Sequence, residues 1–381
     1  MNKKVAHVFT SAYSFRILAN KLKLLKKKGY NIEIVCSREG YDKEFFDKYD
    51  FTIRFVDMSR KIKPFHDIGS IYKMYRLFKK MNYDIVHTHT AKAGIIGRIA
   101  AIKAGIPAVL HTTHGLPFFK GQSFIKYHIY RVFEKVGSWF CDAICSQNRE
   151  DIDKIKSYAP GRKVYYEGNG VDLETLDRQR TNIKKYDILK LKEKWNIEDN
   201  TNIILVAARF EPVKNHRLLL EGLKELKENY SEDFMCLLAG EGYLREEIES
   251  LIEKYNLGGN VKIVGYQKDI FKYIALSDLV VLTSRKEGIP RIIMESMAFS
   301  KAVVATDVLG TRELVRDGRN GYLVPLASKK LAERMRILLN SKEQRKEFGL
   351  EGRKIIEEEF TERIVVSRID KIYKELLNRT N

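Results

Sequence analysis

The chain has 381 residues, of which 44% are hydrophobic and 31% are charged. At about 100–200 residues per domain, this length predicts about two domains, each large enough to bury its own core. The composition excludes a disordered tail and a small disulfide-stapled fold, because the apolar fraction is ordinary and the four cysteines include no Cys-x-x-Cys pair. Cysteines used in this way are typical of a reducing compartment, so we expect a cytoplasmic protein.

The formal net charge is +19 and is concentrated in the N-terminal half. Residues 1–200 hold 38 Lys and Arg against 22 Asp and Glu, whereas residues 201–381 hold 31 against 28. Such a field attracts nucleic acid, anionic lipid headgroups or phosphate-bearing substrates, although it also serves as a solubilising surface. No segment approaches the roughly 18 uninterrupted apolar residues of a membrane span, and the N-terminus has no signal-peptide core, so we expect a soluble or peripheral protein.

Short apolar runs of strand length alternate with segments of helical spacing, and this alternation occurs twice. The strand candidates of the first half are residues 5–9, 32–36, 53–56, 85–87, 108–111, 143–145 and 164–166. Those of the second half are residues 203–207, 235–239, 261–264, 279–282, 302–305 and 321–324. Strands that alternate with helices predict a parallel sheet covered on both faces.

The pattern therefore predicts an α/β protein with two doubly wound, Rossmann-like domains. A polar, charge-rich stretch without strand pattern runs over residues 177–202 and marks the boundary. We expect an N-terminal domain over residues 1–185, a C-terminal domain over 186–360, and a last helix over 361–381 that packs back on the first domain. Such sheets bind ligands at the carboxyl ends of their strands, so two of them facing each other predict a deep interdomain cleft.

The segment after the strand candidate 279–282 has the pattern of an anion site. Glu287 lies on the loop at the carboxyl end of this strand, and Pro290 suits the first turn of the helix that follows. The free backbone N–H groups of that helix start favour a phosphate. Glu295 lies further along the same helix and suits a hydroxyl-bearing part of the same ligand. The alternative is two solvated glutamates that the helix dipole stabilises.

Two more strand ends carry groups that suit a diphosphate. Arg209 and Lys214 follow the first strand of the second domain, and these cations bind phosphate as a fork and as a point charge. Gly240 and Gly242 end the next strand and permit close approach of the backbone to a ligand. Together the three strand ends predict a site for a ligand that carries a diphosphate.

At this point the residues resemble a known family. The spacing of Glu287 and Glu295, with seven residues between them, resembles the EX7E motif of retaining GT-B glycosyltransferases of family 4. The resemblance extends over nearly the whole chain, through the Arg209…Lys214 pair and through the fragments at 240–242, 169–172 (Asn-Gly-Val-Asp) and 114–115 (His-Gly). The histidine-rich stretch from His87 to His114 is similar to bacterial enzymes that build capsule, exopolysaccharide or related lipid-linked glycans.

This resemblance implies a role for each matching residue. Glu287 would contact the donor sugar, Glu295 the ribose, and Arg209 and Lys214 the departing diphosphate, while His114 would lie beside the reacting sugar. The donor-binding set that it implies is Gly240, Glu241, Gly242, Gly288, Ile289, Pro290, Arg291 and Glu295. On the acceptor side we expect Ser14, Phe15, Arg16, His89, Phe118 and Asn169.

The sequence departs from the family pattern in two places. The glycine pair that often follows the first strand is replaced by the loop Thr-Ser-Ala-Tyr-Ser-Phe-Arg at residues 10–16. Arg291 stands where many relatives carry a small or aliphatic residue.

The resemblance implies a retaining transferase that moves a sugar, an N-acetylhexosamine or a related sugar, from a nucleotide diphosphate, expected to be UDP. The expected acceptor is a polyprenyl-diphosphate-linked glycan of capsule, exopolysaccharide or related synthesis. A nucleotide-sugar epimerase or hydrolase of the same fold is the near alternative. A nucleic-acid-binding protein is the remote one, because the chain has no recognisable nucleic-acid-binding module and Glu287 and Glu295 would stay unexplained.

We expect no metal and no other cofactor. Four histidines at 87, 89, 111 and 114 invite a metal hypothesis. We expect His87 and His89 to point to opposite faces of their strand, and no carboxylate or cysteine with ligand spacing completes the set. Asp151 and Asp153 form an Asp-x-Asp string inside a helical pattern, where residues two apart diverge, so we expect them on the solvated surface rather than around a metal.

Two basic, amphipathic segments are candidates for contact with an anionic membrane. Residues 18–28 place Leu18, Leu22 and Leu25 on one face, which fits an ordinary surface helix equally well. Residues 118–131 mix aromatic side chains with cations, and there we favour the membrane, with insertion by Phe118, Phe119 and Tyr127. We therefore expect a cytoplasmic protein that is peripheral to the inner face of the cell membrane.

Overall fold

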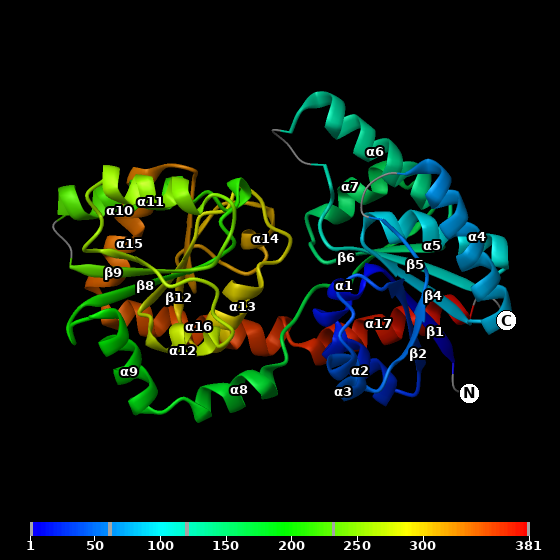
Figure 1. Cartoon of the computed structure of the whole chain (residues 1–381), viewed down its shortest axis with the longest axis horizontal. Coiled ribbons are helices and arrows are strands. Elements are labelled where there is room, and N and C mark those ends of the chain that lie inside the picture. The colour runs from blue at the N-terminus through cyan, green and yellow to red at the C-terminus, as the bar shows by residue number, and fades with distance from the viewer. Residues whose placement is uncertain (1–2, 60–62, 119–121, 231–232, 379–381) are drawn as a thin grey trace. The chain divides into compact units, whose positions relative to one another are not determined.

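The computed structural model describes residues 3–59, 63–118, 122–230 and 233–378. The chain forms two compact units, one of Met1–Asn169 with Glu362–Asn381 and one of Gly170–Thr361. We call them unit 1 and unit 2. Each contains a parallel sheet covered by helices on both faces (Figure 1). The predicted pair of Rossmann-like α/β domains is therefore confirmed.

Unit 1 is built on a seven-stranded sheet, within the described ranges, in the order β3-β2-β1-β4-β5-β6-β7. Its strands are β1 (Lys4–Ser11), β2 (Asn31–Ser37), β3 (Thr52–Phe55), β4 (Ile85–His89), β5 (Ala108–Thr113), β6 (Ala143–Ser146) and β7 (Lys163–Tyr166). The strand order reverses between β1 and β4, which is where ligands bind in doubly wound sheets.

The helices of unit 1 form two layers. One layer, with the core residues Phe15, Leu22 and Tyr373, includes α1 (Ala12–Arg16), α2 (Ala19–Lys27), α3 (Lys43–Tyr49) and α17 (Glu362–Leu377). The other, with the core residues Phe78 and Ile155, includes α4 (Pro64–Met81), α5 (Ala91–Ala104) and α7 (Asp151–Tyr158). The helix α6 (Phe124–Ser138) buries only Glu134, Gly137 and Ser138.

Unit 2 repeats the design with a six-stranded sheet, counted over its described part, in the order β10-β9-β8-β11-β12-β13. Its strands are β8 (Asn202–Ala207), β9 (Phe234–Ala239), β10 (Val261–Ile263), β11 (Leu279–Leu282), β12 (Ala302–Thr306) and β13 (Gly321–Val324). Here the order reverses between β8 and β11.

Helices cover both faces of this second sheet. On one face lie α10 (His216–Tyr230), α11 (Arg245–Lys254) and α15 (Ser328–Asn340). On the other lie α8 (Leu173–Asn182), α9 (Lys185–Trp195), α12 (Ile270–Leu276), α13 (Arg291–Ala298) and α16 (Lys342–Glu359). Two short elements, η1 (Pro212–Lys214) and α14 (Leu309–Arg312), follow β8 and β12.

The division between the units falls earlier than the expected boundary at 185/186. Residues 170–185 belong to unit 2, because Leu176 is buried in its core and Arg353 donates to both oxygens of Asp177, at 2.5 and 2.9 Å. The polar stretch is thus an amphipathic helix pair rather than a linker. The last helix, α17, packs on unit 1, where Ile369 and Tyr373 join the core. None of the helices in the described ranges is long and apolar enough to span a membrane.

Candidate active site

The carboxyl ends of β8, β9 and β11 lie side by side because these strands are parallel neighbours in unit 2. Arg209 and Lys214 follow β8, Gly240 and Gly242 follow β9, and Glu287 follows β11. The sheet therefore brings together the three strand ends that the sequence singled out.

Lys214 and Glu287 form the centre of this edge. The Lys214 ammonium lies 2.6 Å from Glu287 Oε1, and the Ser284 hydroxyl donates to the same oxygen at 2.5 Å. The Thr283 hydroxyl holds η1 in place by contacting the carbonyl oxygens of Lys214 and Asn215 at 3.1 and 3.2 Å. The cation and the carboxylate are thus positioned by the loop after β11 and neutralise each other.

Arg209 has a different partner from Lys214. Its side chain is 72% exposed, and its guanidinium is 2.6 Å from Glu211 Oε1. An exposed arginine with a nearby carboxylate is free to exchange that partner for an incoming phosphate at little cost.

Glu295 lies on α13, which begins at Arg291 rather than at Pro290. Pro290 is the N-cap residue, with extended backbone, so the first free N–H groups of the helix are those of Arg291 and Ile292. Arg291 Nε donates to Glu295 Oε1 at 2.7 Å. Burial raises the pKa of the Glu295 carboxyl, and the Arg291 charge opposes that rise. The unusual Arg291 therefore occupies one oxygen of the carboxylate that the family resemblance assigns to the ribose.

Glycines let the backbones around this edge approach one another. A Cβ on Gly240 would lie 2.0 Å from the Ala208 carbonyl oxygen, and one on Gly242 would lie 2.4 Å from the Phe210 oxygen. Gly310 on α14, which the sequence analysis missed, is closest of all, because its Cβ would lie 1.5 Å from the Gly288 oxygen. The loop that holds Glu287 and Gly288 thus rests directly on α14.

A second missed residue is His216, two positions after Lys214 and the first residue of α10. Its buried ring packs edge-on against Phe210, with ring centroids 5.0 Å apart. Neither ring nitrogen has a hydrogen-bond partner within the described part of the chain. Burial, aided by the Lys214 charge, lowers the pKa of His216 to about 4. In the sequence, its position two residues after Lys214, a predicted ligand of the phosphate, could have identified it.

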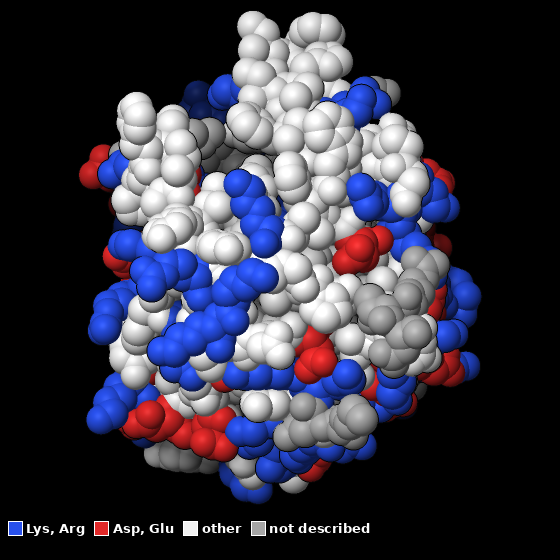
Figure 2. Space-filling model, turned by 90° about the vertical axis from the view of Figure 1, so that its right-hand side faces the viewer, with Lys and Arg blue, Asp and Glu red and all other residues white. Residues whose placement is uncertain are grey.

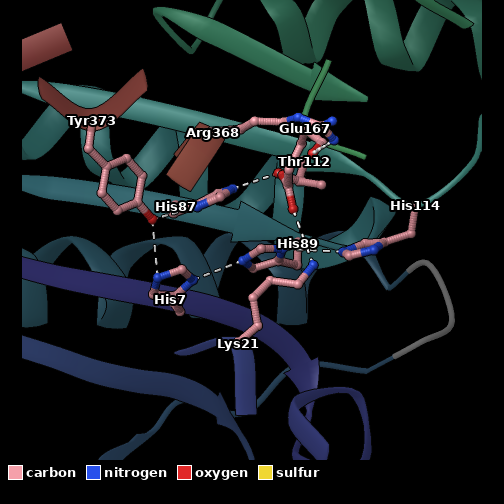
Figure 3. A network of polar contacts seen from close by, with 9 residues as sticks. All are labelled: His7, Lys21, His87, His89, Thr112, His114, Glu167, Arg368 and Tyr373. Carbon is pink, nitrogen blue, oxygen red and sulfur yellow. Dashed lines mark hydrogen bonds and ion pairs between the residues drawn. The ribbon is translucent and has the colours of Figure 1, made fainter. Parts of the chain in front are cut away.

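Three of the four predicted histidines of unit 1, His87, His89 and His114, gather near the reversal between β1 and β4 (Figure 3), whereas His111 contacts the Thr88 hydroxyl at 2.9 Å. His114 Nε2 lies 3.2 Å from His89 Nδ1, and His89 Nε2 lies 2.9 Å from Nδ1 of His7. His7, which the sequence analysis missed, lies on β1 directly opposite His87. His7 could have been identified from the sequence as a polar residue inside an otherwise apolar strand.

The expectation that His87 and His89 point to opposite faces is wrong. Their ring centroids are 4.3 Å apart, because side chains alternate along a strand and residues two apart share a face. Nitrogen atoms of His7, His87 and His89 lie within 4.8 Å of one another, which is a spacing that could hold a metal ion. Burial lowers the pKa of all three and lowers that of His114 to about 4, so these imidazoles are neutral at pH 7.

Two of the expected acceptor-side residues belong to the core instead. Phe15 is fully buried and stacks on Phe46, with ring centroids 4.7 Å apart. Phe118 is buried against Tyr127 and Tyr158. Both predictions are wrong, because an aromatic ring next to a strand end was assigned to a ligand when it fills the space under a helix.

The other acceptor-side residues differ in exposure. Arg16 is exposed and pairs with Asp42 at 2.9 Å, whereas Ser14 and Asn169 are partly buried and His89 is buried. Phe119 lies outside the described residues. The two carboxylates Asp151 and Asp153 diverge on α7, but the expectation that both lie on the solvated surface is wrong for Asp151, which is buried, whereas Asp153 is exposed.

Comparisons with known proteins identify the family of the chain. Residues 187–355 match the family model "Glycosyl transferases group 1", and residues 4–148 match the model "Glycosyl transferase 4-like". A Bacillus subtilis protein named as the glycosyltransferase EpsD is 30% identical over 364 residues, which cover 93% of this chain and 92% of EpsD. The chain belongs to the group 1 glycosyltransferases.

Other relatives of this glycosyltransferase have more specific names. An Escherichia coli UDP-Gal:alpha-D-GlcNAc-diphosphoundecaprenol alpha-1,3-galactosyltransferase is 30% identical over 317 residues, 82% of this chain and 80% of that protein. The structure of Anabaena Alr3699/HepE in complex with UDP and glucose matches with a TM-score of 0.80 at 20% identity, covering 98% of this chain and all of that one. The glycosyltransferase thus has the expected GT-B fold.

Proposed function

We propose that this glycosyltransferase moves a sugar from a UDP-sugar to a polyprenyl-diphosphate-linked glycan in capsule, exopolysaccharide or related synthesis, with retention at the anomeric carbon. We propose an N-acetylhexosamine or a related sugar as the donor sugar. The Escherichia coli relative is named for UDP-Gal and a diphosphoundecaprenol-linked acceptor, and the Anabaena structure holds UDP, which supports the UDP and the lipid-linked acceptor. The observation that carries the proposal is the Lys214–Glu287 pair at the switch point of unit 2, beside the start of α13.

The chemistry that this edge favours is departure of a diphosphate. As the bond between the anomeric carbon and the diphosphate oxygen breaks, its electron pair leaves with UDP. The acceptor hydroxyl bonds to the same carbon from the same face, and its proton passes to the departing diphosphate oxygen. Lys214, released from Glu287, and Arg209, released from Glu211, neutralise the departing charge together with the N–H groups of Arg291 and Ile292. In this proposal the freed Glu287 carboxylate accepts hydrogen bonds from the sugar hydroxyls, and Glu295 accepts them from the ribose.

His114 is the residue of unit 1 that we place against the reacting sugar. Because its imidazole is neutral at pH 7, it acts as a hydrogen-bonding group rather than as a cation. We place the acceptor on the side of Ser14, Arg16, His89 and Asn169.

We propose that α6 holds the protein on the anionic inner surface of the membrane, where a lipid-linked acceptor resides. Phe124, Ile125, Ile129, Val132 and Phe133 are all exposed on this helix. It projects from unit 1 in Figure 1, and Figure 2 shows lysine and arginine side chains gathered below an uncharged protrusion. Apolar side chains beside cations are the combination that binds an anionic interface.

A panel of nucleotide sugars tests the donor. Each is incubated with the full chain, with and without a polyprenyl-diphosphate-linked acceptor, and the released nucleotide and the sugar products are measured. We expect UDP release that the acceptor accelerates, and a new glycosidic bond of the same anomeric configuration as the donor. An altered free nucleotide sugar would instead identify an epimerase, and release that no acceptor accelerates would identify a hydrolase.

The same assay tests whether a metal takes part. Lys214, Arg209 and the start of α13 supply the positive field that a divalent cation would otherwise bring, so we expect full turnover in EDTA. Loss of turnover that magnesium or manganese restores would contradict this mechanism.

A further inference from the structure

A continuous chain of hydrogen bonds joins His114 to the buried carboxylate of Glu167 (Figure 3). It runs from the residue after β5 through β4 to β1, turns at Tyr373 on α17, and returns through β4 and β5 to the residue after β7. The six contacts are His114 Nε2 to His89 Nδ1 at 3.2 Å, His89 Nε2 to His7 Nδ1 at 2.9 Å, His7 Nε2 to Tyr373 OH at 3.1 Å, Tyr373 OH to His87 Nδ1 at 2.7 Å, His87 Nε2 to Thr112 Oγ1 at 2.7 Å, and Thr112 Oγ1 to Glu167 Oε2 at 2.5 Å.

The hydrogen bond at the Glu167 end of this chain has a fixed donor and a fixed acceptor. Glu167 is 1% exposed, and its Oε1 lies 3.4 Å from the ammonium of the equally buried Lys21. The Lys21 ammonium, which is only a donor, donates to Oε1 and leaves Oε2 as the acceptor that faces Thr112. The Thr112 hydroxyl must therefore donate its one hydrogen to Glu167.

This direction passes from one group to the next. Because the Thr112 hydrogen is used, its oxygen accepts from Nε2–H of His87. A neutral imidazole has one N–H and one lone pair, so His87 Nδ1 accepts from the Tyr373 hydroxyl, whose oxygen then accepts from Nε2–H of His7. The neutral state of these imidazoles follows from their burial, which lowers their pKa values.

The same step repeats up to the end of the chain. His7 Nδ1 accepts from Nε2–H of His89, and His89 Nδ1 accepts from Nε2–H of His114. Every donor in the chain thus points toward Glu167. We infer that Glu167 fixes the tautomer of His114, with the hydrogen on Nε2 and the lone pair on Nδ1. The Gln147 side chain also hydrogen-bonds His114, but an amide can present either its oxygen or its NH2, so it follows the tautomer rather than setting it. Glu167 is then a positioning residue, and its effect on turnover rests on the role proposed above for His114.

A metal ion on His7, His87 and His89 is the competing interpretation of the same cluster. A metal would need lone pairs that the chain already uses, since both nitrogens of all three rings have partners at 2.7–3.2 Å. The two arrangements exclude each other. The complete set of partners favours the hydrogen-bonded chain.

The substitution Glu167→Gln tests the inference sharply. The Lys21 ammonium should hold the amide oxygen, which turns the amide NH2 toward Thr112 and makes it a donor. Thr112 then donates to His87, every hydrogen bond in the chain reverses, and His114 carries its hydrogen on Nδ1 instead of Nε2. The probe is the ring-nitrogen chemical shift of 15N-histidine-labelled full-length protein, with the His114 signals assigned from the spectrum of His114→Ala.

Two further variants keep the test decisive. Glu33→Gln is the matched control, because Glu33 is a buried carboxylate of the same unit that accepts from Tyr83 at 2.7 Å but contacts none of these histidines in the described structure. It should leave the His114 tautomer unchanged. If Glu167→Gln does not fold, Thr112→Val breaks the first link at nearly constant volume, and His114 should then populate both tautomers. An Nε2–H tautomer that persists in both Glu167→Gln and Thr112→Val would overturn the inference, as would histidine signals in the wild type that EDTA shifts.

Turnover separates this inference from the proposed function. The reversed tautomer changes Nδ1 of His114 from an acceptor to a donor, so we expect Glu167→Gln to lower kcat by about tenfold, the cost of about one hydrogen bond, with the donor KM unchanged. A reversed tautomer with unchanged kcat would uphold the chain and contradict the role of His114. An unchanged tautomer would contradict the chain alone, whatever happens to kcat.

Discussion

At the residue scale, Lys214 and Glu287 are held against each other before any donor is present. Their charges are largely withdrawn from solvent, with side-chain exposures of 19% and 9%, so each stabilises the other in the free protein. Removing one partner of such a pair leaves the other uncompensated, which makes stability a necessary control for any variant here.

We expect Lys214→Ala to lower kcat by about 100–1,000-fold, since one lost electrostatic contact to charge that develops in the transition state costs about 2.7–4 kcal/mol. Arg209→Ala should lower kcat in the same direction. The control is Arg217→Ala, an exposed cation of α10 that pairs with Glu247 at 2.7 Å and has no place in the proposed site. Steady-state kinetics at saturating donor, with thermal melting to confirm folding, measure the effect. Retention of more than half of wild-type kcat by both site variants would mean that the site is misplaced.

At the element scale, α14 supports the loop of Glu287 through Gly310. We expect Gly310→Ala to weaken UDP binding at least about tenfold, because a methyl group 1.5 Å from the Gly288 oxygen must displace backbone rather than a flexible side chain. Gly259→Ala is the matched control in the same unit, since its Cβ would meet nothing within 4 Å. Isothermal titration of both variants with UDP provides the measurement. Equal affinities would show that α14 does not support the donor loop.

The helices α2 and α6 have similar sequence patterns but different environments. Leu18, Leu22 and Leu25 are buried against the sheet of unit 1, so the apolar face of α2 is unavailable to a membrane. The apolar side chains of α6 are exposed, with Phe124 at 77% and Ile125 at 68%. The predicted insertion by Phe118 is wrong because that ring is buried, and Phe119 and Lys120 lie outside the described residues.

We expect the protein to sediment with vesicles that contain phosphatidylglycerol, but not with vesicles of phosphatidylcholine alone, and half-molar salt should release most of it. The double variant Phe124→Ser/Ile125→Ser should bind at least about tenfold more weakly, because burying one such side chain is worth about 1.5–3 kcal/mol. Tyr243→Ser/Tyr266→Ser removes comparably exposed rings from unit 2 and should change nothing. Equal binding to neutral vesicles, or no binding to either kind, would contradict the membrane proposal and would mean that the basic N-terminal half is a solubilising surface.

At the scale of the whole molecule, the two units differ in their buried histidines. Burial lowers the pKa of His7, His87, His89, His111 and His114 in unit 1, and of His216 in unit 2. The unfolded chain binds a proton at each of these sites near pH 6.5, whereas the folded chain does not. The contribution of these neutral histidines to the free energy of unfolding is therefore complete above pH 6.5, and it is lost as the pH falls toward their pKa values in the folded protein.

Between pH 6.5 and pH 5 we expect each of these histidines to lower the free energy of unfolding of its unit by up to about 2 kcal/mol. Unit 1 has five of the histidines just named and unit 2 has one, so unit 1 should lose much more stability in total. The chain has two tryptophans, Trp139 in unit 1 and Trp195 in unit 2, so Trp195→Phe and Trp139→Phe each leave one fluorescent reporter. Urea unfolding at pH 7 and pH 5 then follows each unit separately. A midpoint for unit 1 that does not move with pH would contradict the neutral histidine cluster.

The sequence by itself determined the two Rossmann-like sheets and the strand ends of unit 2 that carry charged groups. These follow from local signals, because periodicity sets the type of element and the residues after each parallel strand necessarily meet at one edge. That Lys214 and Glu287 lie at the same edge is the clearest case, since both follow neighbouring strands, whereas their ion pair was seen only in the structure.

Only the tertiary structure decided which face of each helix is buried and which distant residues meet. The leucines of α2 and the aromatic side chains of α6 show the same amphipathic pattern, and what packs against each helix makes one a core face and the other a surface. His7, His87 and Tyr373 meet because β1 and β4 are neighbours in the sheet and the last helix returns to cover them. Contacts between residues 80 and 286 positions apart depend on strand order and helix docking, which no local spacing encodes.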